Sequence, residues 1–170
     1  MEGTLKITFS VPKKTVMDMI ATNSFYRGER VKDENGAHAA RMQAGGDNND
    51  ILQDELRLAA ADVVAIITRN LGRCTVIEPT KNTEETSTEV ENTEETVTDN
   101  YDFITLGASN FPMELKSSVE GAIASYMFDK ALEGWMLVNM PNEVQALGQR
   151  SVADAEKLRM LLVERNKPVR

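Results

Sequence analysis

Cysteine and aromatic residues are scarce in this chain, and each shortage excludes a class of structure. The single cysteine, Cys74, rules out an intrachain disulfide and a zinc site built from four cysteines. A lone thiol also suits a cytosolic or virion setting better than a secreted one. Aromatic residues make up only 5% of the sequence while methionine is frequent, a mixture that favours helix–helix packing over a β-sandwich. No apolar run approaches the roughly 20 residues of a membrane span, so we expect no membrane contact.

Residue patterns for catalysis or metal binding are also missing. The only histidine, His38, lies among small polar residues, without the nucleophile and carboxylate that a catalytic histidine needs. Cys74 follows Arg73, a cation that favours a reactive thiolate, but a small buried side chain at the start of a strand is the preferred interpretation. The sequence therefore predicts no active site, no metal and no cofactor, and we expect the protein not to be an enzyme.

The most unusual segment is an acidic stretch of threonine and glutamate at 80–99. It holds seven carboxylates and one base, Lys81, and so carries −6 of the chain's net charge of −8. The pentapeptide Asn-Thr-Glu-Glu-Thr occurs in it twice, at 82–86 and 92–96. Only two valines in the stretch could join a core. We therefore expect it to project from the body as an arm or loop.

Two β-rich runs, 74–77 and 101–106, flank the acidic stretch. Threonine, β-branched and aromatic residues favour strands, so these runs are predicted to pair as an antiparallel ribbon with the acidic stretch at its far end. Together they define an inserted β arm or loop, 74–110, within a helical domain.

The N-terminal third predicts a strand, a short helix and a loop. Residues 5–11 alternate apolar and polar side chains and end at Pro12, which indicates a short strand or extended arm. A short amphipathic helix should begin near this proline and end by about Gly28. The region 31–50 is polar and rich in glycine, asparagine and aspartate, as is typical of a loop.

Apolar residues recur at steps of three and four in three later segments, which predicts amphipathic helices at 51–71, 113–138 and 141–166. Gly72 supplies a stop after the first of these helices. The side chains predicted to face the core are Leu52, Leu56, Ala59, Ala60, Val63, Ile66, Ile67 and Leu71, then Leu115, Val119, Ala122, Ile123, Tyr126, Ala131, Leu132, Trp135 and Val138, and last Val144, Leu147, Val152, Ala155, Leu158, Leu161 and Leu162.

The last two helices are separated by a proline-containing break at 139–142, which predicts an antiparallel helical hairpin. Gly148 is a candidate bend in the final helix, and Ser151 with Asp154 resembles a capping box that would restart it there.

A basic tail, 165–170, follows the last predicted helix, and Pro168 prevents the helix from extending through it. Such a tail suits docking on an acidic partner or on phosphate. Its candidate binding residues are Arg165, Lys167, Pro168, Val169 and Arg170.

These elements predict a mainly α fold for 1–170 as a single helical domain. The expected architecture is a small helical bundle with a long C-terminal helical hairpin and a β-hairpin-like acidic insertion.

This layout resembles the head-to-tail connector, or adaptor, proteins of tailed phages. The likeness is carried by the order of the elements and by the segments 130–135 (Lys-Ala-Leu-Glu-Gly-Trp), 139–144 (Asn-Met-Pro-Asn-Glu-Val) and 161–170 (Leu-Leu-Val-Glu-Arg-Asn-Lys-Pro-Val-Arg). The same segments are similar to structural-gene products of phages and prophages of Bacteroides-type bacteria. The acidic repeat departs from this pattern.

The resemblance implies a virion neck protein that forms a homo-oligomeric ring between the portal protein and the tail or neck proteins, after assembly in the host cytoplasm. The basic tail would reach the portal, passing DNA would be touched at most transiently, and the β arm would reach a neighbouring subunit or the next ring. The arm residues with this implied role are Val76, Ile77, Glu84, Glu85, Glu94, Glu95, Tyr101 and Phe103.

One alternative from a different class stays open. A bacterial helical interaction or adaptor module could bind a basic partner through the acidic stretch, because a dense run of carboxylates attracts cationic surfaces.

Overall fold

The computed structural model describes residues 5–30, 50–79, 99–106, 110–139, 141 and 144–164. Its elements are, in chain order, β1 (Lys6–Pro12), α1 (Lys13–Arg30), α2 (Asp50–Asn70), β2 (Cys74–Ile77), β3 (Asn100–Leu106), a short 3-10 helix η1 (Met113–Leu115), α3 (Lys116–Asn139) and α4 (Val144–Val163). This part of the chain is mostly helical with a small antiparallel sheet, so the expectation of a mainly α protein is confirmed. The predictions for 31–49, 80–98 and 165–170 lie outside the described residues.

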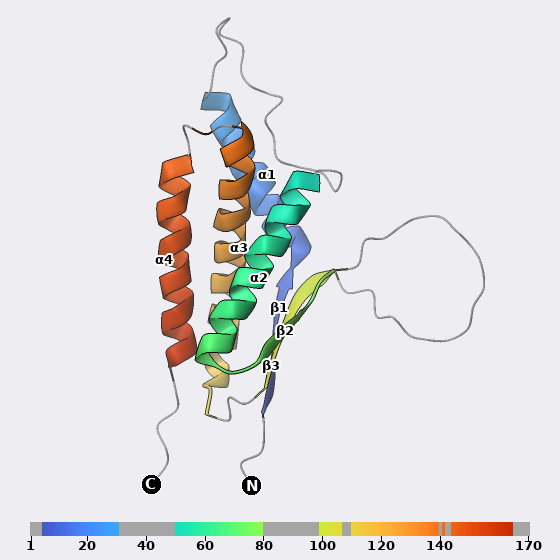
Figure 1. The fold of residues 1–170 in the computed structure, drawn as a ribbon, viewed down its shortest axis with the longest axis vertical. Helices are drawn as coiled ribbons and strands as arrows, with labels where there is room; N and C mark the ends of the chain where they lie inside the picture. Colours follow the sequence, from blue (N-terminus) through green and yellow to red (C-terminus); the bar gives the residue numbers. More distant parts are fainter. Residues whose placement is uncertain are drawn as a thin grey trace, which may run out of the picture.

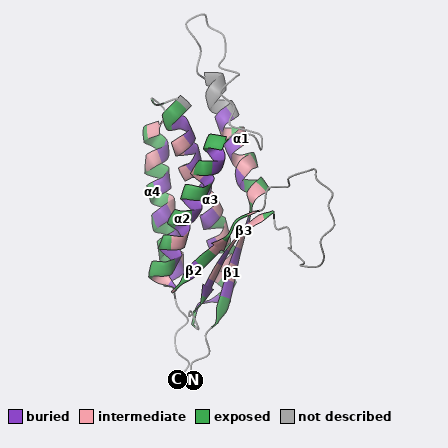
Figure 2. Cartoon of the chain, turned by 45° about the vertical axis from the view of Figure 1, so that its right-hand side comes forward, coloured by how far each residue is buried: buried purple, intermediate pink, exposed green. Residues whose placement is uncertain are grey.

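The elements pack in layers. The sheet forms one side of the body, α2 and α3 pack against it, and α4 packs on the far side of these two helices (Figure 1). α1 continues directly from β1 and packs against α3. Exposed positions follow the outer surface of α4, while the interior between the layers is buried (Figure 2). The sheet and α4 therefore lie on opposite sides of the helical layer.

β3 is the central strand of the sheet and runs antiparallel to both β1 and β2. Its pairing with β1 extends from Lys6 opposite Leu106 to Pro12 opposite Asn100, so the start of the described chain is tied to a segment 88 to 100 positions later. Alternate side chains of the sheet turn inward. These inward-facing residues are Ile7, Phe9, Val11, Cys74, Tyr101, Phe103 and Thr105.

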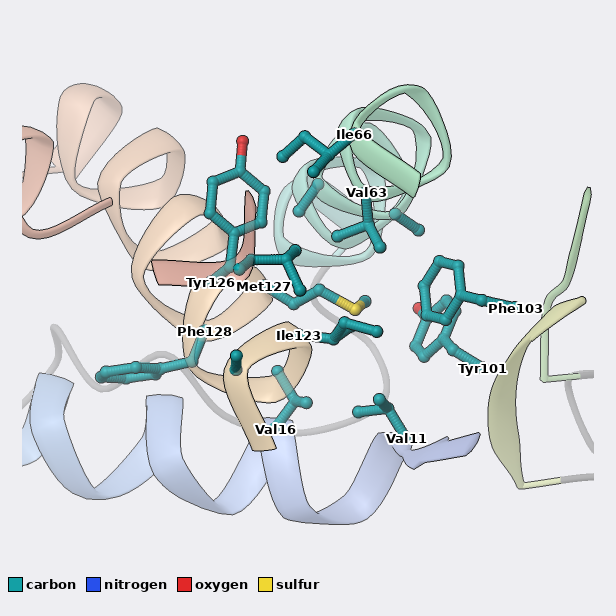
Figure 3. Close-up of a cluster of buried hydrophobic side chains, with 14 of the residues drawn as sticks. Val11, Val16, Val63, Ile66, Tyr101, Phe103, Ile123, Tyr126, Met127 and Phe128 are labelled. Atoms are coloured by element: carbon teal, nitrogen blue, oxygen red, sulfur yellow. The ribbon is translucent and has the colours of Figure 1, made fainter. Parts of the chain in front are cut away.

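The inward face of the sheet meets α3 in the centre of the core. Tyr101 and Phe103 extend from β3 toward Ile123 and Met127 of α3 (Figure 3). Phe9 on β1 meets Phe111 edge to face, with ring centroids 5.8 Å apart, a geometry that adds about 0.5–1.5 kcal/mol beyond the burial of apolar area. The sheet is thus an integral wall of the core.

This arrangement corrects one part of the sequence interpretation. The predicted pairing of the two β-rich runs is confirmed, because Cys74 lies opposite Thr105 and Ile77 opposite Asp102. However, the expectation that Tyr101 and Phe103 belong to a projecting arm is wrong. Their exposed fractions are 2% and 0%, because β3 is paired on both sides and its inward side chains are covered by helices. They offer no surface to a neighbouring subunit.

α2 has the predicted inward face, since all eight apolar residues listed for it are buried. The helix ends where Gly72 adopts a positive φ of 123°, a conformation that glycine tolerates and other residues rarely adopt. The Leu71 N–H donates to the Ile67 carbonyl at 2.8 Å and so satisfies one of the carbonyls left open at the helix end. The side-chain amide of Asn70 donates to the preceding carbonyl, that of Ile66, also at 2.8 Å. The glycine then turns the chain into β2.

α3 and α4 lie side by side (Figure 1). α4 continues without a break past Gly148 and Ser151, so the predicted restart at a capping box is wrong. The Ser151 hydroxyl instead lies 3.0 Å from the Gly148 carbonyl and 3.0 Å from Glu133 Oε2 on α3. A serine whose hydroxyl bonds to the preceding turn does not need to end the helix.

Two residues predicted to face the core point outward. Val138 near the end of α3 is 65% exposed and Val152 on α4 is 63% exposed. The inward seam of α4 is formed by Leu147, Ser151, Ala155, Leu158 and Leu162, whose steps of four, four, three and four residues put Ser151 where Val152 was expected. Val152 was predicted to be buried because it is more hydrophobic than Ser151. In the structure Ser151 is the buried residue of the two, and its hydroxyl contacts Glu133.

Replacing Gly72 by alanine should destabilise the protein. A Cβ at this position would lie 2.8 Å from the Leu106 carbonyl oxygen, and the φ of 123° is unfavourable for alanine. We expect a loss of about 1–3 kcal/mol in the free energy of unfolding, measured by chemical denaturation.

The matched control is Gly121→Ala on the exposed side of α3, where an added Cβ meets nothing within 4 Å. Alanine favours the helix there, so this variant should be unchanged or more stable by up to about 1 kcal/mol. Equal effects of the two substitutions would show that Gly72 is not conformationally required.

Candidate functional site

The described residues contain no group of three or more histidine, cysteine, aspartate or glutamate side chains that could hold a metal ion. Nor is any helix among them long and apolar enough to cross a membrane. The buried titratable side chains of the described residues are Cys74, Tyr101, Tyr126 and Asp129.

Cys74 begins β2 with its thiol directed into the core. Burial raises the pKa of the thiol to about 11, so the side chain is protonated at neutral pH and is a poor nucleophile. Its backbone N–H donates to the hydroxyl of Thr68 on α2 at 3.3 Å. The preferred interpretation from the sequence, a small buried side chain at a strand start, is confirmed.

The buried polar side chains of α3 hold the helical layer together. The Tyr126 hydroxyl donates to Asp62 Oδ2 on α2 at 3.1 Å, and the pKa of Tyr126 is raised, first by burial and then by this neighbouring carboxylate. Asp129 is buried and lies 3.3 Å from the Arg150 guanidinium on α4. The same guanidinium lies 5.9 Å from the centre of the Phe128 ring. These contacts fix α3 against both neighbouring helices.

The outward face of the sheet is the first exposed surface. Alternation along the strands turns Thr8, Thr75, Asp102 and Ile104 away from the core, since their neighbours in sequence are buried. Ile77 at the end of β2 is 50% exposed, whereas Val76 turns inward and packs against the core. Of the four described residues with an implied arm role, only Ile77 offers substantial surface.

The edges of this sheet are less suited to contact than its face. On β1, the Ser10 N–H donates to Glu120 Oε1 of α3 at 2.9 Å, and Pro12 has no N–H to offer. On the other edge, β2 is only 4 residues long, and the Cys74 N–H is taken by Thr68. Blocked and short edges discourage the addition of a further strand, so contacts through side chains on the face are favoured.

The acidic segment 80–98 is inserted at one corner of this sheet. Ile77 lies opposite Asp102, so the chain leaves β2 next to the place where it enters β3. On the leaving side, Glu78 lies 3.4 Å from Arg57 of α2. On the returning side, the Asp99 carbonyl accepts a hydrogen bond from the Lys13 N–H at 3.0 Å. Both ends of the segment are therefore attached to the body by contacts that sequence reasoning did not predict.

The outer side of α4 is the second exposed surface. Val152, Met160 and Val163 are 63%, 71% and 61% exposed, and Glu156 forms an ion pair with Arg159 between them. The sequence analysis placed Val152 in the core and did not consider Met160 or Val163. Their spacing from the inward seam would have identified them, because the helix already has a complete buried face without them.

No protein-family model matches the chain, and neither a curated protein nor a solved structure does so. The two exposed surfaces and the attachment of the acidic segment are the features of the described residues that bear on function.

The buried thiol should be protected from modification. At pH 8, we expect the native protein to react with Ellman's reagent at least about 100-fold more slowly than a Thr75→Cys variant, whose new thiol lies on the exposed face. In denaturant, the two thiols should react at similar rates. Rapid reaction of Cys74 in the native wild-type protein would contradict its burial.

Stability should fall in alkali partly because of Tyr101. Its pKa is raised to about 12, chiefly by burial and in part by the Glu78 carboxylate, with Arg57 acting in the opposite direction. Between pH 10 and 12 the unfolded chain loses the phenolic proton while the folded chain keeps it, so the free energy of unfolding decreases as pH rises. This contribution should reach roughly 2–3 kcal/mol near the top of the window.

Tyr101→Phe tests this directly by thermal unfolding across the same pH range. The variant should lose stability less steeply than the wild type above pH 10 and show the same pH dependence below pH 9. Parallel curves for the two proteins would exclude Tyr101 as a source of the alkaline loss.

Proposed function

We propose that this chain is a structural protein of a tailed-phage virion, a head-to-tail connector or adaptor whose copies form a ring between the portal and the tail. The single observation that carries the proposal is the insertion of the acidic segment into a firmly anchored sheet. Both ends of 80–98 depart from one corner of a wall of the core. A charged segment attached in this way suits contact with a second protein.

The anchoring has a mechanical consequence. β3 is central in the sheet and its inward side chains are buried against α3, so force on the acidic segment is carried into the core. An assembly protein needs such a connection, because an interaction made by a projecting segment must hold the body in place. A free acidic terminus on a flexible linker would lack this rigidity.

The outward sheet face offers a second contact next to the segment. Ile77 and Leu106 are 50% and 49% exposed, and threonines accompany them on this face. In the proposed ring, this face meets a neighbouring copy or the next ring while the acidic segment extends beyond it. The carboxylates repel passing DNA and so prevent adhesion in the channel.

The remaining parts of the proposal concern partners and place. The basic tail, 165–170, meets the portal protein, and its cations favour an acidic surface there. Assembly occurs in the host cytoplasm, and the finished ring resides in the virion neck. No enzymatic role is included, since the chemically capable side chains of the described part serve packing and helix–helix contacts.

Quantitative mass spectrometry of purified, DNA-filled particles tests this function. The chain should be present at a low, fixed ratio to the portal protein. If it is expressed in the same cells but absent from clean particles, the connector proposal fails. The acidic segment then becomes bait for a basic cellular partner, as the adaptor alternative requires.

Deleting 81–98 should separate folding from assembly. The paired strands and the core lie outside the deleted segment, so the shortened loop should change stability by less than about 1 kcal/mol, measured by chemical denaturation. Incorporation into particles should fail in the same variant, measured by mass spectrometry after complementation.

A full-length variant with Glu84, Glu85, Glu94 and Glu95 replaced by glutamine is the matched control for length. If charge carries the contact, this variant should fold normally and also fail to incorporate. Normal incorporation of the deletion variant would remove the acidic segment from the proposed mechanism, and an unfolded deletion variant would show that it supports the core.

A further inference from the structure

The outer side of α4 carries a pattern that is complementary to itself. Val152, Glu156, Arg159 and Val163 follow one another at steps of four, three and four residues, the spacing that places side chains along one seam of a helix. All four are exposed, and each directly follows a residue of the buried seam, so together they line one flank of that seam. The two valines at the ends of this row are 63% and 61% exposed.

The order of these residues is symmetric about the midpoint between Glu156 and Arg159. Laying a second α4 antiparallel about that midpoint places Val152 opposite Val163 of the second copy, and Val163 opposite its Val152. Glu156 then lies opposite Arg159 of the second copy, and Arg159 opposite its Glu156. Apolar residues therefore meet apolar residues at both ends, and opposite charges meet in the middle.

The parallel arrangement lacks this match. In register, it places Glu156 beside Glu156 and Arg159 beside Arg159, which puts like charges together at the centre of the contact. The antiparallel pair also gives the existing Glu156–Arg159 ion pair two further partners, so that four charges of alternating sign form one network. Met160, 71% exposed, lies one helical turn from Glu156, beside the exposed row formed by Val152, Glu156, Arg159 and Val163.

We propose that the α4 faces of two copies of this chain pair antiparallel about a two-fold axis through this midpoint. Two-fold pairing is the commonest way in which identical chains associate, because one self-complementary surface suffices. The pair leaves the sheet of each copy free, since α4 and the sheet lie on opposite sides of the helical layer (Figure 1). The proposal therefore goes beyond the connector function and holds whether or not the chain enters a virion.

Charge exchange tests the pairing in the full-length protein. Sedimentation equilibrium over roughly micromolar to millimolar protein should show a monomer–dimer equilibrium for the wild type. Glu156→Arg and Arg159→Glu should each weaken dimerisation at least tenfold, because each places two like-charge pairs across the two-fold axis. The double exchange E156R/R159E restores the opposite charges and should restore dimerisation to within about threefold of the wild type.

The matched control is Asp54→Arg on α2. Asp54 and Arg57 form an exposed ion pair with the same three-residue spacing, so D54R makes the same change of charge without touching α4. It should leave dimerisation unchanged. Circular dichroism and thermal unfolding should show that all four variants are folded, as expected for exposed ion pairs of small energetic value.

Disulfide trapping gives the orientation independently. V152C/V163C should form a covalent dimer under mild oxidation, whereas V152C alone should not, because the antiparallel pair places Val163 opposite it. The native thiol does not compete, since Cys74 is buried. Three results would overturn the proposal: a monomeric wild type throughout the concentration range, association that is indifferent to both single charge changes, or efficient cross-linking of V152C alone.

Discussion

The described body depends above all on β3 being held between two strands and against a helix. This central strand brings together β1, from the start of the described chain, and β2, which follows α2. Its aromatic side chains face α3, so the same seven residues complete both the sheet and the core. Removing apolar area of this kind from water supplies roughly 25 cal/mol per Å².

The position of β3 also determines how the acidic segment is attached. The acidic segment 80–98, with six carboxylates and one lysine, cannot form a core of its own, and at the end of a loose linker it would transmit little force. Between two paired strands, its ends are held close together and are tied to α1 and α2 by Asp99 and Glu78. Electrostatic character and mechanical anchorage are thus provided by different parts of the chain.

The buried polar groups limit what chemistry the body can perform. Asp129 lies beside a guanidinium, the Tyr126 hydroxyl donates to a carboxylate, and the Cys74 thiol is kept neutral by burial. Each of these groups is engaged in packing or in fixing one helix against another. The surfaces that remain available are broad faces of mixed apolar and polar character, and such faces suit protein partners better than small substrates.

The sequence by itself determined the local elements. Apolar spacing identified α2 and its buried face, Gly72 marked its end, and the alternation in 5–11, 74–77 and 101–106 predicted the strands and the pairing of β2 with β3. The tertiary structure decided what those strands belong to. No local pattern indicated that β1 pairs with β3, because strand partners far apart in sequence are selected by the burial they achieve together. The same reason explains the errors at Tyr101, Phe103 and Val152. Periodicity says which residues share a face, but only packing against other elements decides whether that face is covered or exposed.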